Sequence, residues 1–164
     1  MIKILFVCHG NICRSTMAEY VMKYLVKSYK IADDFFIDSA ATSTEEIGNP
    51  VHPGTRRKLK EVGIPCGDHR ARQLKKSDYE KYDYLIGMDS WNIRNIIRII
   101  GNGDPDGKVS RLLDFTDRVG EDIADPWYTG NFDATYRDVR EGCEGLLNQI
   151  MEEGIGRENR KGHC

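Results

Sequence analysis

The sequence has no long run of apolar residues. The apolar stretch nearest its start, ILFV at 4–7, is far shorter than the roughly 20 residues that cross a bilayer or the roughly 7–15 of a secretory signal. The pattern therefore predicts no membrane-spanning segment. We expect a cytoplasmic protein with no membrane partner.

The chain also has little net charge. Its 24 Lys and Arg residues nearly balance its 26 Asp and Glu residues, which leaves a formal charge of −2. Proteins that bind nucleic acids along their surface are usually basic, because they must neutralise phosphates. We therefore expect no nucleic-acid partner, although a local basic pocket remains possible.

The chain lacks regularly spaced or paired cysteines. An odd number of cysteines with no secretory signal argues against a disulfide framework, and no pair has the C-x-x-C spacing of zinc or thioredoxin sites. Cys8, His9 and Cys13 alone, with no distant second pair of ligands, are too few for a convincing metal site. We expect neither metal nor cofactor. The five cysteines are Cys8, Cys13, Cys66, Cys143 and Cys164.

Short β-branched runs alternate with helical patterns along the chain. This alternation predicts an α/β fold, a single three-layer domain with a four-stranded parallel sheet flanked by helices. We expect the domain to cover 1–154 and a polar tail to follow at 155–164, with loops at 39–54 and 114–131. The expected strands are 2–7, 35–38, 83–88 and 109–113, and the expected helices are 15–29, 54–62, 90–99 and 132–152.

The segment CHGNICRS at 8–15 joins the first expected strand to the first expected helix. A helix N-terminus attracts anions, and Gly10 allows a backbone to approach a phosphate closely. The same positive potential favours the thiolate form of Cys8, a nucleophile toward phosphorus. Arg14 can hold two phosphate oxygens with its planar guanidinium. Ser15 can cap the helix, or donate a hydrogen bond to the sulfur when it leaves.

Phosphoryl transfer also needs a proton donor for the leaving oxygen. Asp125 is the favoured candidate, because it lies in a long polar loop and is followed by Pro126, Trp127 and Tyr128. The aromatic side chains could form a wall beside an aromatic substrate. Taken alone, Asp-Pro is only a turn signal, and the case for an acid depends on the Cys8 segment.

Together these segments resemble the low-molecular-weight protein tyrosine phosphatase family over nearly the whole chain. The segment VCHGNICRS at 7–15 is similar to that family's phosphate loop, and DPWY at 125–128 is similar to its acid loop. The segments DSAAT at 38–42, GNP at 48–50, HRARQ at 69–73 and MD at 88–89 follow in the family's order.

The resemblance implies a role for each matching position. Cys8 would be the nucleophile, Arg14 the phosphate binder, and Asp125 the general acid and then the base. The substrate would be a phosphotyrosine protein or a small aryl phosphate, inorganic phosphate would be the product, and the protein would be a monomer or self-associate weakly. The expected phosphate and substrate contacts are His9, Gly10, Asn11, Ile12, Cys13, Ser15, Trp127 and Tyr128, with Asn11, Ser15, Ser39, His69 and Asp89 as a supporting network.

The resemblance also bears on redox regulation through Cys13 and on substrate specificity at Glu45. A second cysteine placed like Cys13 can form a reversible disulfide with the nucleophile in this family. The alternative is that Cys13 is a small buried apolar residue. Many members carry an aromatic residue where this chain has Glu45. An acidic side chain there predicts weaker stacking and repulsion of acidic phosphopeptides.

Three other functions remain open. An arsenate reductase of the same fold needs further cysteines for a disulfide relay, and this chain has none between Cys66 and Cys143. A protein arginine phosphatase carries Thr where this chain has Ile12, and an apolar side chain suits a phenyl phosphate better than a guanidinium. A phosphate-binding module without activity would need neither a thiol nor an acid.

Overall fold

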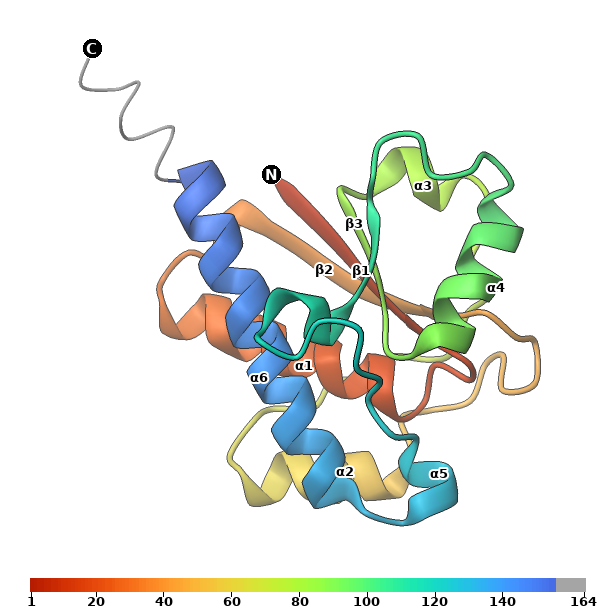
Figure 1. Cartoon of the computed structure of the whole chain (residues 1–164). Coiled ribbons are helices and arrows are strands. Elements are labelled where there is room, and N and C mark those ends of the chain that lie inside the picture. The colour runs from red at the N-terminus through yellow and green to blue at the C-terminus, as the bar shows by residue number, and fades with distance from the viewer. Residues whose placement is uncertain (156–164) are drawn as a thin grey trace.

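A four-stranded parallel sheet forms the centre of the protein, seen in a computed structural model that describes residues 1–155 (Figure 1). The strand order is β2-β1-β3-β4, so the first strand lies inside the sheet. The predicted fold class is confirmed. The strands are β1 (Ile2–Cys8), β2 (Phe35–Ala41), β3 (Tyr84–Gly87) and β4 (Val109–Arg111).

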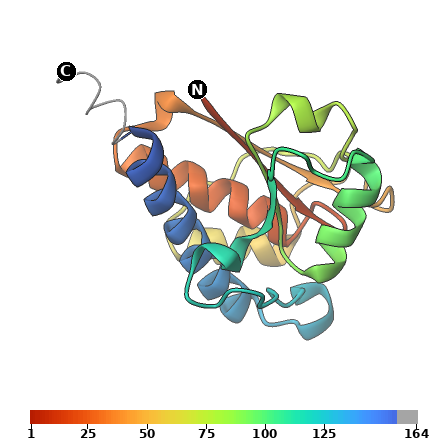
Figure 2. The same ribbon diagram turned by 45° about the horizontal axis from the view of Figure 1, so that its top comes forward.

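Helices cover both faces of the sheet, which makes the domain three-layered (Figures 1 and 2). The core on one face includes Ile4 and Phe6 of β1, and the core on the other includes Leu5 and Val7. This explains why β1 reads as a continuous apolar run rather than an alternating one. The α-helices are α1 (Arg14–Ser28), α2 (Pro53–Glu61), α3 (Asp78–Lys81), α4 (Ser90–Ile100), α5 (Pro126–Thr129) and α6 (Phe132–Ile150).

Local sequence sets the ends of α4. The Asp89 carboxylate accepts a hydrogen bond from the backbone N–H of Asn92, and the Asn92 side chain bonds back to the backbone of Asp89. This reciprocal cap starts the helix at the residue after the aspartate. Gly101 ends α4 in the left-handed conformation, with φ of 67°, which glycine adopts without strain.

Several boundaries differ from the sequence prediction. β2 continues to Ala41, because its whole length pairs with β1, and this overrides the loop-like composition of 39–41. The expected strand at 109–113 stops at Arg111 and turns into a 3-10 helix, Leu112–Phe115. The expected loop 114–131 contains the one-turn helix α5, and α3 was not predicted.

No helix among residues 1–155 is long and apolar enough to span a bilayer. Apart from Ile155, the tail predicted for 155–164 lies outside the described residues.

Candidate active site

The loop between β1 and α1 wraps around the sulfur of Cys8. The thiol lies 3.0 Å from Ser15 Oγ, and the backbone N–H of Asn11 points at Sγ from 3.3 Å. Both contacts come from the start of α1 or the loop before it, where the helix offers free N–H groups and a positive dipole end. A sulfur anion at Cys8 would therefore have two hydrogen-bond donors, Ser15 and Asn11.

The prediction that Ser15 caps α1 is wrong. The helix begins at Arg14, Cys13 occupies the cap position, and no side chain caps the helix. Ser15 points instead toward the loop, where its Oγ also accepts a hydrogen bond of 2.8 Å from Asn11 Nδ2. With this bond formed, the hydroxyl hydrogen of Ser15 is free to point at a thiolate.

Asn11 holds the loop in a backbone conformation that residues other than glycine rarely adopt. It is fully buried and has a φ of 60°. Besides the bond to Ser15, its Oδ1 accepts hydrogen bonds from His69 Nε2 at 2.7 Å and from the backbone N–H of Arg72 at 3.2 Å. These bonds satisfy the buried amide and offset the left-handed backbone, which costs about 1–2 kcal/mol.

Behind Asn11, a buried carboxylate anchors the imidazole of His69. Glu19 Oε1 lies 3.3 Å from His69 Nδ1 and accepts a hydrogen bond of 2.6 Å from Ser39 Oγ. Asp38 Oδ1 is 3.4 Å from the same imidazole nitrogen. The sequence prediction included Ser39 and His69 in the supporting network but did not include Glu19, which is buried.

Glu19, Asp38 and His69 are also the group among residues 1–155 that could hold a metal ion, with ligand atoms within 4.8 Å of one another. Glu19 already bonds to Ser39, and His69 to Asn11. These bonds indicate that the group anchors the loop around Cys8. Cys8, His9 and Cys13 do not form a metal-ligand group in the part of the chain that the structure describes.

Arg14 lies buried under the site, between two carboxylates. Its Nη1 donates to Asp89 Oδ2 at 2.6 Å and to the backbone oxygen of Ile123 at 2.9 Å, and its Nη2 lies 3.5 Å from Asp125 Oδ2. Burial alone would lower the pKa of the guanidinium, but the charges of Cys8, Asp89 and Asp125 raise it. Arg14 therefore stays cationic and fixed in orientation.

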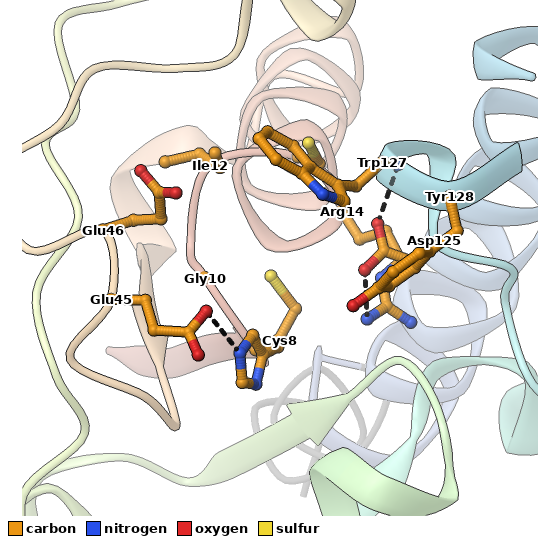
Figure 3. A pocket seen from close by; sticks show the side chains of 11 residues that line it. Cys8, Gly10, Ile12, Arg14, Glu45, Glu46, Asp125, Trp127 and Tyr128 are labelled. Atoms are coloured by element: carbon orange, nitrogen blue, oxygen red, sulfur yellow. Dashed lines mark hydrogen bonds and ion pairs between the residues drawn. The ribbon is translucent and has the colours of Figure 1, made fainter. Parts of the chain in front are cut away.

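Asp125 lies opposite Cys8, at the start of α5 (Figure 3). Its Oδ1 accepts a hydrogen bond of 3.0 Å from the backbone N–H of Trp127, and its Oδ2 faces Arg14. Trp127 and Tyr128 follow on the same helix and are exposed. Cys8, Arg14 and Asp125 thus line one pocket of about 100 Å³, with Trp127 and Tyr128 at its edge.

Glutamates from the loop after β2 form the other edge of the pocket (Figure 3). Glu45 Oε2 lies 3.0 Å from His9 Nε2, and both side chains are largely exposed. Glu46 also lines the pocket and packs near Gly10. The sequence singled out Glu45 and missed Glu46.

His52 is a further residue that sequence reasoning missed. Its backbone N–H donates to the carbonyl of Ile12 at 2.9 Å, and its imidazole meets Trp127 edge-on with ring centres 5.7 Å apart. Burial and the nearby charge of Arg57 lower the pKa of His52, which favours the neutral ring. His52 thus supports both the loop and an aromatic side chain of the pocket. A single histidine before Pro53 gave no sequence signal for this.

The family to which the chain belongs follows from a match over most of its length. The model of the low molecular weight phosphotyrosine protein phosphatases matches residues 3–157. The chain belongs to this family. Its members are hydrolases, so the predicted family and enzyme class are confirmed.

Known phosphatases are similar to this one in sequence and structure. The low molecular weight protein-tyrosine-phosphatase YfkJ of Bacillus subtilis is 40% identical over 154 residues, which are 93% of this chain and 98% of YfkJ. The crystal structure of YfkJ has a TM-score of 0.89, with 39% identity and coverage of 94% of this chain and 97% of that one. The Streptococcus pyogenes low molecular weight protein tyrosine phosphatase has a TM-score of 0.82, with 40% identity and 96% and 98% coverage.

A relative named for another substrate also shares the fold. The drosophila arginine phosphatase has a TM-score of 0.82 at 28% identity, and the match covers 91% of this phosphatase and 98% of that chain. The fold alone therefore does not select between phosphotyrosine and phosphoarginine.

The structure brings the predicted site residues of this phosphatase together. His9, Gly10, Ile12 and Cys13 line the pocket with Cys8 and Arg14. Ser39 and His69 lie behind the loop, and Asp89 holds Arg14 from the start of α4.

Proposed function

We propose that this phosphatase hydrolyses phosphotyrosine in proteins, and small aryl phosphates, through a covalent intermediate on Cys8. The supporting observation is that the groups needed for phosphoryl transfer lie around the sulfur atom of Cys8. The hydroxyl of Ser15 and the backbone N–H of Asn11 contact Cys8 Sγ, and a fixed guanidinium and a carboxylate line the same pocket. A protein that only bound phosphate would gain nothing from the thiol or from the carboxylate of Asp125.

The residues suggest an order of events. The Cys8 thiolate attacks phosphorus, the bond from phosphorus to the phenolic oxygen breaks, and protonated Asp125 gives its proton to that oxygen. Asp125 then takes a proton from water as the water attacks phosphorus. The P–S bond breaks, inorganic phosphate leaves, and the sulfur anion returns. The N–H groups of the loop from His9 to Ser15 and the guanidinium of Arg14 stabilise the phosphoryl oxygens throughout.

Turnover of p-nitrophenyl phosphate tests the proposal. Cys8→Ser should reduce kcat about 10⁴-fold or more, in line with the loss of other catalytic nucleophiles. Asp125→Asn should reduce kcat about 10²- to 10⁴-fold. Cys66→Ser serves as the control, because Cys66 is a half-buried thiol outside the pocket. Since the chemistry uses sulfur, EDTA should leave the rate unchanged.

The open alternatives give different results in a substrate panel. Wild type that binds vanadate without any turnover would be a binding module. Faster release of phosphate from phosphoarginine than from phosphotyrosine peptides would identify an arginine phosphatase, and thiol-dependent reduction of arsenate would identify an arsenate reductase. The apolar side chain of Ile12 on the pocket wall favours the phenyl ring.

We also propose that Cys13 protects an oxidised Cys8. Burial, and then the charge of Cys8, raise the pKa of Cys13 to about 12, so Cys13 is a thiol at neutral pH. Peroxide would oxidise the Cys8 thiolate to a sulfenic acid and itself become water, which removes that charge. Cys13 sulfur would then attack the oxidised sulfur, form the disulfide, and release the sulfenic oxygen as water.

Recovery after oxidation tests this protection. Wild type treated briefly with peroxide should regain its activity in dithiothreitol, and Cys13→Ser should recover far less, because its Cys8 oxidises further. Equal recovery by both proteins would refute the role of Cys13. Cys143→Ser is the control, since burial also raises the pKa of that cysteine and it lies in the core.

We also propose the domain extent, the oligomeric state and the location of the enzyme. Residues 1–154 form the phosphatase domain, and the chain acts as a monomer or a weakly associating one. A cytoplasmic location suits a mechanism that depends on a reduced thiol, because cytosolic thiols are kept reduced.

A further inference from the structure

Exposed aromatic side chains gather around the pocket. Trp127 and Tyr128 are 58% and 83% exposed, and Trp91 on α4 is 64% exposed. Large aromatic side chains in water that cluster at a concave site commonly mark a contact surface. Trp127 and Tyr128 line the catalytic pocket, whereas Trp91 does not.

Trp91 lines a second hollow, which continues from the catalytic pocket. This hollow measures about 250 Å³ and lies between the start of α4 and α5. Figures 1 and 2 show the N-terminal end of α4 directed toward α5. The two hollows share the side chains of His9, Arg14, Asp125 and Tyr128. A molecule whose phosphate lies at Cys8 can therefore extend into the second hollow without leaving the protein surface.

The walls of this hollow suit an apolar side chain. Trp91 lines it from α4 and Tyr128 from α5, and Asn95 of α4 also lines it. The carboxylates that reach it, Asp89 and Asp125, both pair with Arg14. The guanidinium of Arg94 stacks on the ring of Trp91, 4.8 Å from its centre, which steadies the indole.

We propose that the hollow between Trp91 and Tyr128 binds a large apolar side chain of the substrate, within two residues of the phosphotyrosine. The inference rests on the proposed function, because it places the phosphotyrosine at Cys8. Two residues of extended chain span about 7 Å, so the neighbouring side chains of a bound peptide fall beside the pocket. Trp91 is thus a specificity-determining residue of this hollow.

The test compares matched phosphotyrosine peptides. One set carries Leu or Phe at a single position from −2 to +2, and the reference carries Ala there. We expect wild type to prefer the best Leu or Phe peptide about 10-fold in kcat/KM, mainly through KM, as for other apolar specificity pockets. Trp91→Ala should reduce this ratio to about 2-fold or less, and Trp91→Phe should keep most of it.

Tyr29→Ala is the matched control, because Tyr29 is an exposed aromatic residue at the end of α1, outside both hollows. Thermal unfolding of each variant checks that the fold is intact. A ratio that stays the same in Trp91→Ala overturns the subsite while leaving the phosphatase proposal standing. No hydrolysis of p-nitrophenyl phosphate by wild type would overturn the proposed function and the subsite together.

Discussion

The bottom of the catalytic pocket and its mouth are built in opposite ways. The bottom, formed by Cys8, Asn11, Arg14 and Ser15, is buried, and hydrogen bonds or ion pairs fix each polar side chain there. The mouth is formed by exposed and half-buried side chains whose partners, such as His9 for Glu45 and Arg94 for Trp91, are exposed themselves. We infer that the bottom determines the reaction and the mouth determines the substrate. The residues of the mouth are Glu45, Glu46, Trp91, Trp127 and Tyr128.

Arg14→Lys should have the largest effect among the variants that sharpen this comparison. Lysine cannot hold Asp89 and the carbonyl of Ile123 while it also binds two phosphate oxygens, so we expect kcat to fall about 10²- to 10³-fold on every substrate. Steady-state kinetics on an aryl phosphate and a phosphotyrosine peptide measure this. Arg98→Lys, at an exposed position of α4, is the control.

A loss confined to peptides would contradict the assignment of Arg14 to the bottom of the pocket. That residue would then act in substrate choice.

A pair of variants at Asn11 separates backbone strain from hydrogen bonding. Both Asn11→Gly and Asn11→Ala lose the bonds to Ser15 and His69, but only glycine adopts a φ of 60° freely. We expect Asn11→Ala to be the less stable of the two by about 1 kcal/mol, measured by urea unfolding. Equal stabilities would show that the loop relaxes to another conformation once the side chain is gone.

We expect the smallest change in activity from substitutions at the mouth of the pocket. Glu45→Gln and Glu46→Gln should each raise kcat/KM for peptides with Asp or Glu beside the phosphotyrosine by about 2- to 5-fold, since a single exposed charge contributes at most about 1 kcal/mol. Peptides with Lys at those positions should change in the opposite direction. The effect should shrink at high salt, more for the exposed Glu45 than for the half-buried Glu46.

Glu80→Gln is the control for the mouth, because Glu80 is an exposed glutamate of α3 that does not line the pocket. A change in kcat on p-nitrophenyl phosphate as large as that on acidic peptides would show that the rim acts on catalysis itself.

Sequence reasoning succeeded where the signal was local. A buried strand, a loop with a cysteine and an arginine, and a helical pattern are contiguous in 2–29, and Asp89 marks the start of α4 by its own capping chemistry. It failed at long-range pairings. Glu19 with Lys23 four residues later looks like an exposed helix pair, yet Glu19 is buried against Ser39 and His69. Only the packing of α1 on the sheet reveals this.

The mouth was the least predictable part of the site. Trp91 follows a helix cap and reads as an ordinary surface residue, and Glu46 lies in a polar loop. Their positions at the two hollows depend on where the loop after β2 and the start of α4 lie at the carboxyl edge of the sheet, which no single segment encodes.

The most direct test of the central claim is a rapid-quench experiment. Wild type is mixed with excess p-nitrophenyl phosphate, quenched in acid within milliseconds, digested, and analysed by mass spectrometry. We predict one phosphoryl group on the peptide that contains Cys8, with more of it in Asp125→Asn than in wild type if that residue also activates water, and none in Cys8→Ser. Turnover with no phosphorylated peptide, or with the phosphoryl group on another residue, would contradict the account.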